Sequence, residues 1–342
     1  MFRNFYVEKI VQESATIKSF YLKRTDNKAL DNYLPGQFVT IKIKENSNVN
    51  EQIRNYTISD SPGKGYFRLT IKREENGNVS KYFHDTLKIG DIVAVSKPSG
   101  NFYLQPNNSN TAFFLSGGVG ITPMLCMLEY IAENEQAKKV FFLHSSLNKK
   151  VQPMLTRLKE LKSKNSNLYL SVHHSNPSSE EKLKVDYDYE GVISKEYLQN
   201  ILPETETDFF LCGPTPFMAA MYSYLLELGV NEKNINYEFF GDGKKFDSKK
   251  SIEEINLTDY KVHFTKSGIV TYWDSNSNSI LDLAEANGLS PSFSCRMGTC
   301  STCESKLKSG NIEYDPEPFM EAEEGNIFIC CSKPTSNIEI EL

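Results

Sequence analysis

The stretch 294–303 reads Ser-Cys-Arg-Met-Gly-Thr-Cys-Ser-Thr-Cys and places cysteines at Cys295, Cys300 and Cys303. Two more cysteines, Cys330 and Cys331, follow this C-x₄-C-x₂-C spacing. Three close thiolates with a fourth further along the chain form the ligand pattern of a plant-type [2Fe–2S] cluster. The glycine inside the stretch can adopt backbone angles that other residues avoid, so the loop can wrap a cluster and direct N–H groups at its sulfurs.

Two other uses of these cysteines fit the sequence less well. A zinc site usually combines two short Cys-x-x-Cys pairs, and the second pair is missing here. Disulfides suit small secreted domains, whereas this chain has 342 residues and seven cysteines, an odd number. The spacing alone leaves open whether Cys330 or Cys331 is the fourth ligand.

Length and composition indicate a soluble protein with several domains. At about 150 residues per domain, the length favours two or three domains. The first nine residues include the charged Arg3, Glu8 and Lys9 where a signal peptide needs an apolar run, so a cytoplasmic location is predicted. The uncharged stretch 111–128 is interrupted by three glycines and Pro123. A buried strand, a glycine turn and a helix are therefore expected there, and no membrane span.

Charge is unevenly distributed along the chain. Residues 259–342 contain 13 Asp and Glu against 6 Lys and Arg, a net charge of −7, and the remainder carries +1. The acidity therefore belongs to the segment that holds the cysteines. No basic patch of the kind that binds nucleic acid is present in the sequence, so no nucleic-acid partner is expected.

The rhythm of apolar residues changes twice along the chain. Up to about residue 106, short alternating runs such as 38–43 and 67–72 are separated by turn signals, which predicts an antiparallel β-barrel. From 111 to 241, the apolar runs 112–115, 140–143, 168–172 and 209–211 alternate with helical segments such as 123–133 and 216–228. This succession predicts a doubly wound α/β sheet. A polar linker and a compact domain follow, with a helix predicted over 279–287.

Two motifs in the barrel section could bind a ligand that combines a phosphate with a flat ring. The run 54–59, Arg-Asn-Tyr-Thr-Ile-Ser, puts Arg54 and Tyr56 on one face of an extended strand, where they can meet a phosphate and a flat ring. The turn 77–80, Gly-Asn-Val-Ser, precedes a short helical stretch, and its backbone N–H groups can meet an anion. A solvent-facing strand and a plain serine N-cap are the alternative interpretations.

The α/β section carries the corresponding nucleotide signals. The run 116–123, Ser-Gly-Gly-Val-Gly-Ile-Thr-Pro, lies between a strand and a helix, and its glycines let the backbone approach a pyrophosphate. Thr122 is predicted to cap that helix, with Pro123 at its first position. Cys212 follows the last buried strand, where a small buried residue without further function is the alternative.

The order of these motifs resembles the ferredoxin–NADP⁺ reductase superfamily. The resemblance implies three domains: a flavin-binding antiparallel β-barrel (1–107), an NAD(P)-binding doubly wound α/β domain (108–243) and, after a linker (244–257), an α+β (β-grasp) ferredoxin domain (258–342). Flavin contacts are implied for Arg54, Tyr56, Thr57, Ser59, Lys72, Gly77, Asn78, Val79 and Ser80. Nucleotide contacts are implied for Gly117, Gly118, Gly120, Thr122, Pro123, Cys212, Gly213, Pro214 and Phe240. Residues expected to act in catalysis are Thr57, Cys212, Glu238 and Phe240.

The same resemblance addresses the questions that spacing leaves open. In the ferredoxin pattern the last ligand lies four residues before a proline, which selects Cys330 beside Cys295, Cys300 and Cys303. The local sequence is similar to the reductase module of flavohaemoglobins, which implies FAD. The domain order is similar to that of phthalate dioxygenase reductases, which bind FMN, so FMN is the alternative. NADH is expected because 144–148 and 173–176 contain no Arg to hold a 2′-phosphate, with NADPH as the alternative.

The expected activity is NAD(P)H-dependent electron transfer. A hydride passes to the flavin, and single electrons then pass through the cluster to a redox partner protein, expected to be a multicomponent oxygenase of Rieske or similar type. One alternative is a reductase for another metalloprotein. Another is a ferredoxin-type carrier or sensor whose flavin half is degenerate. The five histidines are expected to pack or face solvent without forming a metal site.

Overall fold

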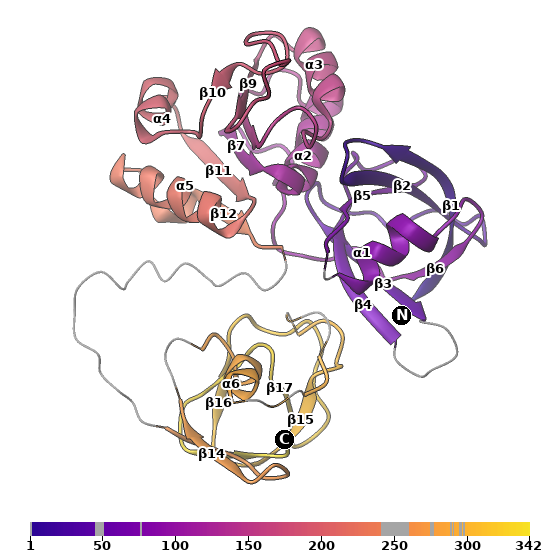
Figure 1. The fold of residues 1–342 in the computed structure, drawn as a ribbon, viewed down its shortest axis with the longest axis vertical. Helices are drawn as coiled ribbons and strands as arrows, with labels where there is room; N and C mark the ends of the chain where they lie inside the picture. Colours follow the sequence, from indigo (N-terminus) through magenta and orange to yellow (C-terminus); the bar gives the residue numbers. More distant parts are fainter. Residues whose placement is uncertain are drawn as a thin grey trace. The chain divides into compact units, whose positions relative to one another are not determined.

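The computed structural model describes residues 2–44, 51–75, 77–240, 260–273, 277–287, 289, 291–293, 296 and 298–342 (Figure 1). The chain divides into two compact units, 1–240 and 241–342. The predicted linker 244–257 lies outside the described residues. None of the described helices is both long and apolar enough to cross a lipid bilayer.

The first sheet of unit 1 is antiparallel and has the strand order β4-β3-β6-β1-β2-β5. A further bridge between Ile58 and Leu69 joins the continuation of β4 to β5, so the two edges of the sheet meet, as the predicted barrel requires. Phe20, Phe67 and Phe83 are fully buried inside it. Its elements are β1 (Arg3–Gln12), β2 (Ile17–Arg24), β3 (Phe38–Lys44), β4 (Glu51–Thr57), β5 (Phe67–Lys72), α1 (Asn78–Lys81), a π-helical turn (Tyr82–Thr86) and β6 (Ile92–Val95).

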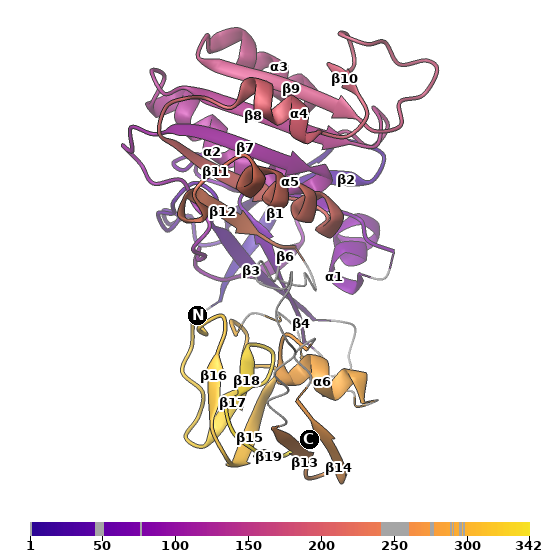
Figure 2. The same cartoon turned by 90° about the vertical axis from the view of Figure 1, so that its left-hand side faces the viewer.

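The second sheet of unit 1 is parallel throughout, with the order β10-β9-β8-β7-β11-β12. Helices cover both faces (Figure 2), and the apolar core between the sheet and α2 and α3 includes Phe114, Phe142 and Phe210. Its elements are β7 (Thr111–Gly117), a 3₁₀ turn (Gly118–Gly120), α2 (Ile121–Asn134), β8 (Val140–Ser146), α3 (Leu155–Lys164), β9 (Leu168–His174), β10 (Tyr189–Glu190), α4 (Lys195–Ile201), β11 (Thr207–Cys212), α5 (Thr215–Glu227), a 3₁₀ turn (Glu232–Asn234) and β12 (Ile235–Glu238).

The chain enters this sheet at β7, in its middle, and later crosses to β11 on the other side. The strand order therefore reverses between β7 and β11. In open α/β sheets, ligands bind beyond the carboxyl ends of the strands at such a reversal. The predicted strand, glycine turn and helix over 111–128 are confirmed as β7, the 3₁₀ turn and α2.

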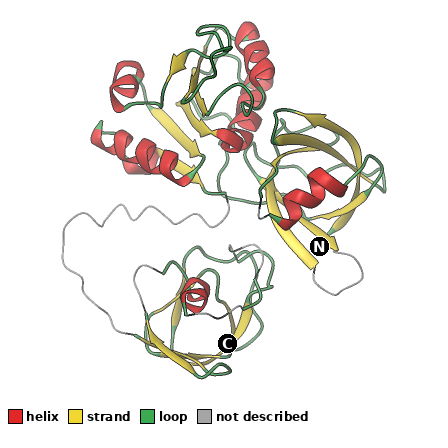
Figure 3. Cartoon of the chain, in the orientation of Figure 1, coloured by secondary structure: helices red, strands yellow, loops and turns green. Residues whose placement is uncertain are grey.

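Among its described residues, unit 2 combines a mixed five-stranded sheet, β14-β13-β19-β15-β17, with the two-stranded sheet β16-β18 and one helix (Figure 3). The predicted helix is confirmed as α6 (Ile280–Ala286), and Ser279 caps it by accepting a hydrogen bond from the Asp282 N–H (3.2 Å). The strands are β13 (Lys261–Phe264), β14 (Ile269–Tyr272), β15 (Glu304–Ser309), β16 (Ile312–Tyr314), β17 (Asn326–Phe328), β18 (Ser332–Pro334) and β19 (Ile338–Ile340).

Candidate active site and cluster loop

The Arg-x-Tyr-Thr motif lies at the end of β4. Arg54 pairs with Ile41 and Tyr56 with Val39 across the β3–β4 ladder, so Arg54 and Tyr56 share one face of the strand. The Tyr56 ring lies 5.7 Å from the ring of Phe83, measured between centroids. Since Phe83 is fully buried in the turn that continues α1, the structure brings the strand motif beside the glycine turn 77–80.

The turn 77–80 is tightly packed. The Ser80 hydroxyl donates to the Gly77 carbonyl (3.2 Å) and accepts from the Glu74 N–H (3.2 Å). A Cβ atom at Gly77 would overlap the Ser80 oxygen, so this position excludes larger residues. Gly77 is the N-cap of α1, and Asn78 and Val79 begin the helix, which leaves their N–H groups available to an anion.

The glycine loop after β7 lies against the turn that follows β11. A Cβ atom at Gly120 would overlap the Cys212 carbonyl, and one at Gly117 would lie 2.9 Å from Pro214. A Cβ atom at Gly213 would lie 3.0 Å from the Gly117 nitrogen. Glycine is therefore required on both sides, and two motifs far apart in sequence form one backbone surface at the strand reversal.

The predicted helix start at this loop is wrong by two residues. Gly120 is the N-cap of α2, and Thr122 and Pro123 are its second and third residues. The Thr122 hydroxyl donates to the Val119 carbonyl (3.1 Å) and caps nothing. The 3₁₀ turn 118–120 begins the helical winding earlier than propensity suggests, and a proline in the first turn removes no intrahelical hydrogen bond.

Three strand ends converge beside this loop. Ser116 on β7 pairs with Cys212 on β11, which in turn pairs with Glu238 on β12. Thr57, at the end of β4 in the barrel, hydrogen-bonds to the Glu238 carboxyl group. The structure thus brings together three residues that were predicted to be catalytic, Thr57, Cys212 and Glu238, beside the glycine loop.

Glu238 and Cys212 are both held neutral. Burial raises the pKa of the Glu238 carboxyl to about 8, against the opposing effect of its hydrogen bond with Thr57. Burial also raises the pKa of the Cys212 thiol, and the nearby Glu238 adds to this effect. The Glu238 Oε2 atom is buried without a hydrogen-bond partner among the described residues. An orphaned buried oxygen fits a site that a ligand completes.

Three other residues that were predicted to contact the flavin or the nucleotide, Ser59, Lys72 and Phe240, have different surroundings. Ser59 is fully buried, and its hydroxyl bonds to Thr70 (2.8 Å) and to the Arg68 carbonyl (3.0 Å). Lys72 is solvent-exposed and forms an ion pair with Glu74 (2.8 Å). Phe240, the last described residue of unit 1, is 40% exposed. Its ring is therefore open to solvent beyond the end of β12.

Three of the histidines that were expected to pack or face solvent are buried together on β8 and β9, and the sequence did not predict this grouping. His144, His173 and His174 are almost completely buried, and burial lowers the pKa of His144 to about 3 and that of His173 to about 4. His144 Nδ1 lies 2.7 Å from the Ser116 hydroxyl, which immediately precedes the glycine loop. The pairing of strands across the sheet brings them together, and sequence periodicity carries no signal of that pairing.

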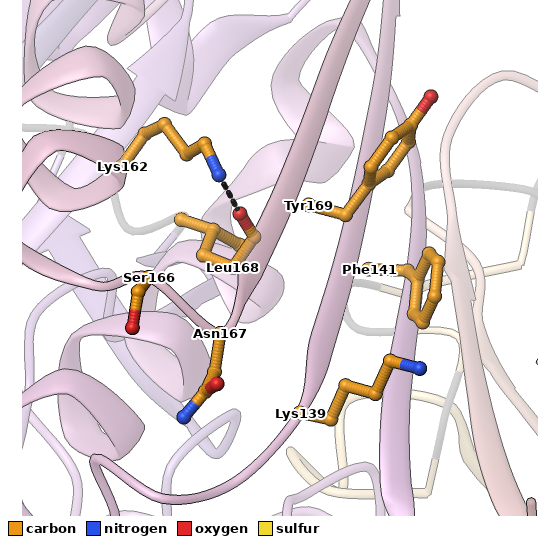
Figure 4. A pocket seen from close by; sticks show the side chains of 7 residues that line it. All are labelled: Lys139, Phe141, Lys162, Ser166, Asn167, Leu168 and Tyr169. Carbon is orange, nitrogen blue, oxygen red and sulfur yellow. Dashed lines mark hydrogen bonds between the residues drawn. The ribbon is translucent and has the colours of Figure 1, made fainter.

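A surface cavity of about 320 Å³ lies at the opposite edge of the same sheet (Figure 4). It is formed at the amino ends of β8 and β9, whereas the glycine loop follows the carboxyl end of β7. The Lys162 ammonium donates to the Leu168 carbonyl there. The cavity is therefore separate from the candidate site; its lining residues are Lys139, Phe141, Lys162, Ser166, Asn167, Leu168 and Tyr169.

In unit 2 the sulfur atoms of Cys330 and Cys331 have different hydrogen-bond partners. The Gly298 N–H in the cysteine loop donates to the Cys330 sulfur (3.3 Å). The Cys331 thiol donates to the Phe328 carbonyl (3.6 Å) and is fully buried. A sulfur that already accepts a loop N–H fits the environment of a cluster thiolate. Cys295 lies outside the described residues.

The loop around these sulfurs has the predicted backbone freedom. Gly298 has φ +64°, and a Cβ atom there would lie 2.7 Å from Pro318 and 2.9 Å from the Cys331 sulfur. Arg296 also has a positive φ, and its guanidinium bonds to Asp282 (3.1 Å) and Glu285 (2.7 Å) on α6. Within the described residues, no three His, Cys, Asp or Glu side chains converge as a metal site.

Comparison with known proteins agrees with this architecture. Three family models match in order: the oxidoreductase FAD-binding domain over 4–103, the oxidoreductase NAD-binding domain over 114–223 and the 2Fe-2S iron-sulfur cluster binding domain over 262–335. The flavohemoprotein of Bacillus thuringiensis subsp. konkukian is 38% identical over 245 residues, which are 70% of this chain and 61% of that protein. The chain thus matches about three fifths of the length of this curated relative.

Two solved structures extend the likeness. The FAD/NAD binding domain of the nitric oxide dioxygenase from Vibrio cholerae is 31% identical, with a TM-score of 0.64, over 70% of this chain and 98% of that one. Phthalate dioxygenase reductase, at 20% identity and a TM-score of 0.61, shares the fold over 100% of this chain and 98% of its own.

These matches define a modular flavin and iron-sulfur oxidoreductase. The chain belongs to the ferredoxin–NADP⁺ reductase superfamily and carries a C-terminal 2Fe-2S ferredoxin domain. The predicted fold class and the cofactor set of FAD, NAD and a [2Fe–2S] cluster are confirmed.

Replacing Glu238 by Gln should change how stability depends on pH. With a folded-state pKa of about 8 and an unfolded value near 4.5, the folded state retains a proton that the unfolded state loses between these values. The stability of the wild type should therefore fall as pH rises through this window. The stability of Glu238→Gln relative to wild type should rise by about 3 to 4 kcal/mol between pH 5 and pH 8, measured by urea unfolding. The exposed Glu206→Gln is the control, and parallel curves for Glu238→Gln and wild type would refute the assignment.

Replacing each of the adjacent cysteines tests the choice of the fourth ligand. Cys330→Ser should abolish or strongly alter the electron paramagnetic resonance signal of the reduced cluster, because it exchanges a thiolate ligand for a hydroxyl. Cys331→Ser should leave that signal nearly intact, since its sulfur is directed at the Phe328 carbonyl. The opposite pattern would assign the ligand to Cys331.

Proposed function

We propose that this protein is a reductase that takes reducing equivalents from NADH and delivers single electrons to a separate protein. The observation that carries the proposal is the convergence of Thr57, Cys212 and Glu238 where the barrel meets the glycine loop. A bound flavin accepts a hydride from the nicotinamide and releases electrons singly, and a [2Fe–2S] cluster carries one electron at a time. The protein thereby links two-electron to one-electron chemistry.

The residues of unit 1 have distinct roles in this proposal. Arg54 and the N–H groups of the turn 77–80 hold the flavin phosphates, and Tyr56 packs against the ring system. The Thr57 hydroxyl and the neutral Glu238 carboxyl orient the flavin edge where the nicotinamide arrives. The glycine loop 117–120 and the turn 212–214 receive the dinucleotide, and Phe240 covers the nicotinamide position until the nucleotide displaces it.

The residues near the expected adenosine ribose favour NADH. Two lysines follow the segment 144–148, Lys149 and Lys150, and Lys149 forms an ion pair with Asp186 (2.8 Å). The buried imidazoles of His144 and His173 are neutral at physiological pH. A 2′-phosphate would therefore find no arginine fork in 144–148 or 173–176.

The surface of unit 2 supports a protein acceptor. Phe319 and Met320 are 48% and 47% exposed, and the Phe319 N–H donates to Gly298 of the cysteine loop (3.3 Å). Exposed carboxylates flank this apolar pair, and none of them forms an ion pair with a described residue: Glu317, Glu321, Glu323 and Glu324. An apolar centre with an acidic rim fits an acceptor with a basic rim. The fold shared with phthalate dioxygenase reductase favours a multicomponent oxygenase as that acceptor.

Steady-state turnover tests the proposed activity. The purified holoprotein should reduce ferricyanide with NADH, and kcat/KM should be at least tenfold higher for NADH than for NADPH because no arginine meets the 2′-phosphate. A ferredoxin-type carrier with a degenerate flavin half would show no turnover with either nucleotide. A preference for NADPH would overturn the nucleotide assignment alone.

Ionic strength should affect the rate of electron transfer to the acceptor much more than the rate of flavin reduction by NADH. Transfer to the protein acceptor should slow several-fold between low and high ionic strength, because opposite charges steer the encounter and salt screens them over about 8 Å at physiological ionic strength. Reduction of the flavin by NADH should change little. Stopped-flow measurement of both steps is decisive, and a salt-independent second step would leave the acidic rim without a role in docking.

A further inference from the structure

A charged cluster is buried inside unit 1, between the barrel and helix α2. Its centre is Arg68 on β5, whose side chain is 7% exposed. One guanidinium nitrogen lies 3.1 Å from Glu129 Oε1 on α2, and another lies 3.5 Å from Asp60 Oδ2. The exposed fractions of the Asp60 and Glu129 side chains are 5% and 2%. These three groups are therefore almost completely removed from water.

The hydrogen bonds of the cluster are nearly complete. Arg68 Nε also donates to the Ser59 hydroxyl (3.2 Å), and a terminal nitrogen donates to the Ser59 carbonyl. Arg157 on α3 binds Glu129 through two nitrogens, at 2.9 and 3.1 Å. The Tyr66 hydroxyl donates to Asp60 Oδ2 (2.9 Å). Two arginines thus face two buried carboxylates, and Arg157 also pairs with the exposed Glu160 (3.1 Å).

Asp60 and Glu129 belong to the two chain segments that also carry residues of the candidate site. Asp60 follows Thr57 by three residues on the continuation of β4. Glu129 lies on α2, which begins at Ile121 immediately after the glycine loop; eight residues of helix span about 12 Å. The Cys126 thiol on α2 also donates to the Asp60 carbonyl (2.9 Å). The cluster therefore connects the segment that carries Thr57 to the helix that carries the nucleotide loop.

We propose that Arg68 is a positioning residue, which fixes the nucleotide loop relative to the flavin-facing end of β4 through Glu129 and Asp60. Buried ion pairs contribute little net stability, because desolvation offsets their attraction, but each bond requires a defined direction. Hydride transfer depends steeply on the distance and alignment of the two rings. A directional contact between the two elements that hold these rings therefore acts on the rate more than on nucleotide affinity. This inference rests on the proposed function.

The test compares two ion pairs that link the same parts of the molecule. Arg68→Met removes the central charge and retains much of the side-chain volume. The control is Lys64→Met, because Lys64 pairs with Glu133, also on α2, but both side chains are exposed, at 32% and 36%. In stopped flow with flavin-loaded protein, Arg68→Met should lower the limiting rate of flavin reduction at saturating NADH at least tenfold. The apparent Kd for NADH should change less than threefold, and Lys64→Met should stay within twofold of wild type in both.

A second variant separates positioning from folding. The triple variant Asp60→Asn, Arg68→Met, Glu129→Gln removes all three charges of the trio, while Arg157 retains its ion pair with Glu160 (3.1 Å). It should also show the slow limiting rate. Amide hydrogen exchange provides a readout independent of turnover: exchange in 121–134 should be faster in both variants than in wild type and Lys64→Met. Limiting rates within twofold of wild type for both variants would overturn the inference. If wild-type flavin is not reduced by NADH, the proposed function fails instead.

Discussion

The backbone contact between the glycine loop and the turn after β11 is the constraint on which the site depends. The Cys212 carbonyl occupies the space that a side chain at residue 120 would need, and Gly117 and Gly213 meet in the same way. Such an approach is available only where two parallel strands end side by side at a reversal of strand order. The glycines are therefore required by packing between backbones.

That contact also determines the electrostatics of the site. It places Cys212 beside Glu238 and brings the end of β12 to Thr57. Burial keeps the Glu238 carboxyl and the Cys212 thiol protonated, so the junction contains no fixed negative charge near neutral pH. A neutral junction suits the approach of two flat rings, because a buried anion would require a compensating charge. The charged groups of this region lie deeper, around Arg68, where arginines pair with carboxylates.

Much of the architecture could be predicted because it follows from local patterns. Alternating apolar residues indicated the barrel strands, and continuous apolar runs indicated the buried parallel strands, since each pattern reflects which faces of a strand are covered. The helix start at 121 could not be predicted from capping preferences, because the 3₁₀ turn and the contact with Cys212 decide it. The burial of Ser59 was missed for a similar reason: its partners Arg68 and Thr70 belong to another strand.

The sequence by itself determined the three-part organisation, the cofactor classes and the cysteine spacing, because these depend on residues close together in the chain. Tertiary structure alone decided which of these residues meet. Arg68 and Glu129 are 61 positions apart, and His144 reaches Ser116 only through the pairing of β7 with β8. The tertiary structure also decides the partners of the adjacent cysteines. The Cys331 thiol donates to the Phe328 carbonyl, and the Cys330 sulfur accepts from the Gly298 N–H. Burial and hydrogen-bond direction are properties of the assembled fold, and no local pattern encodes them.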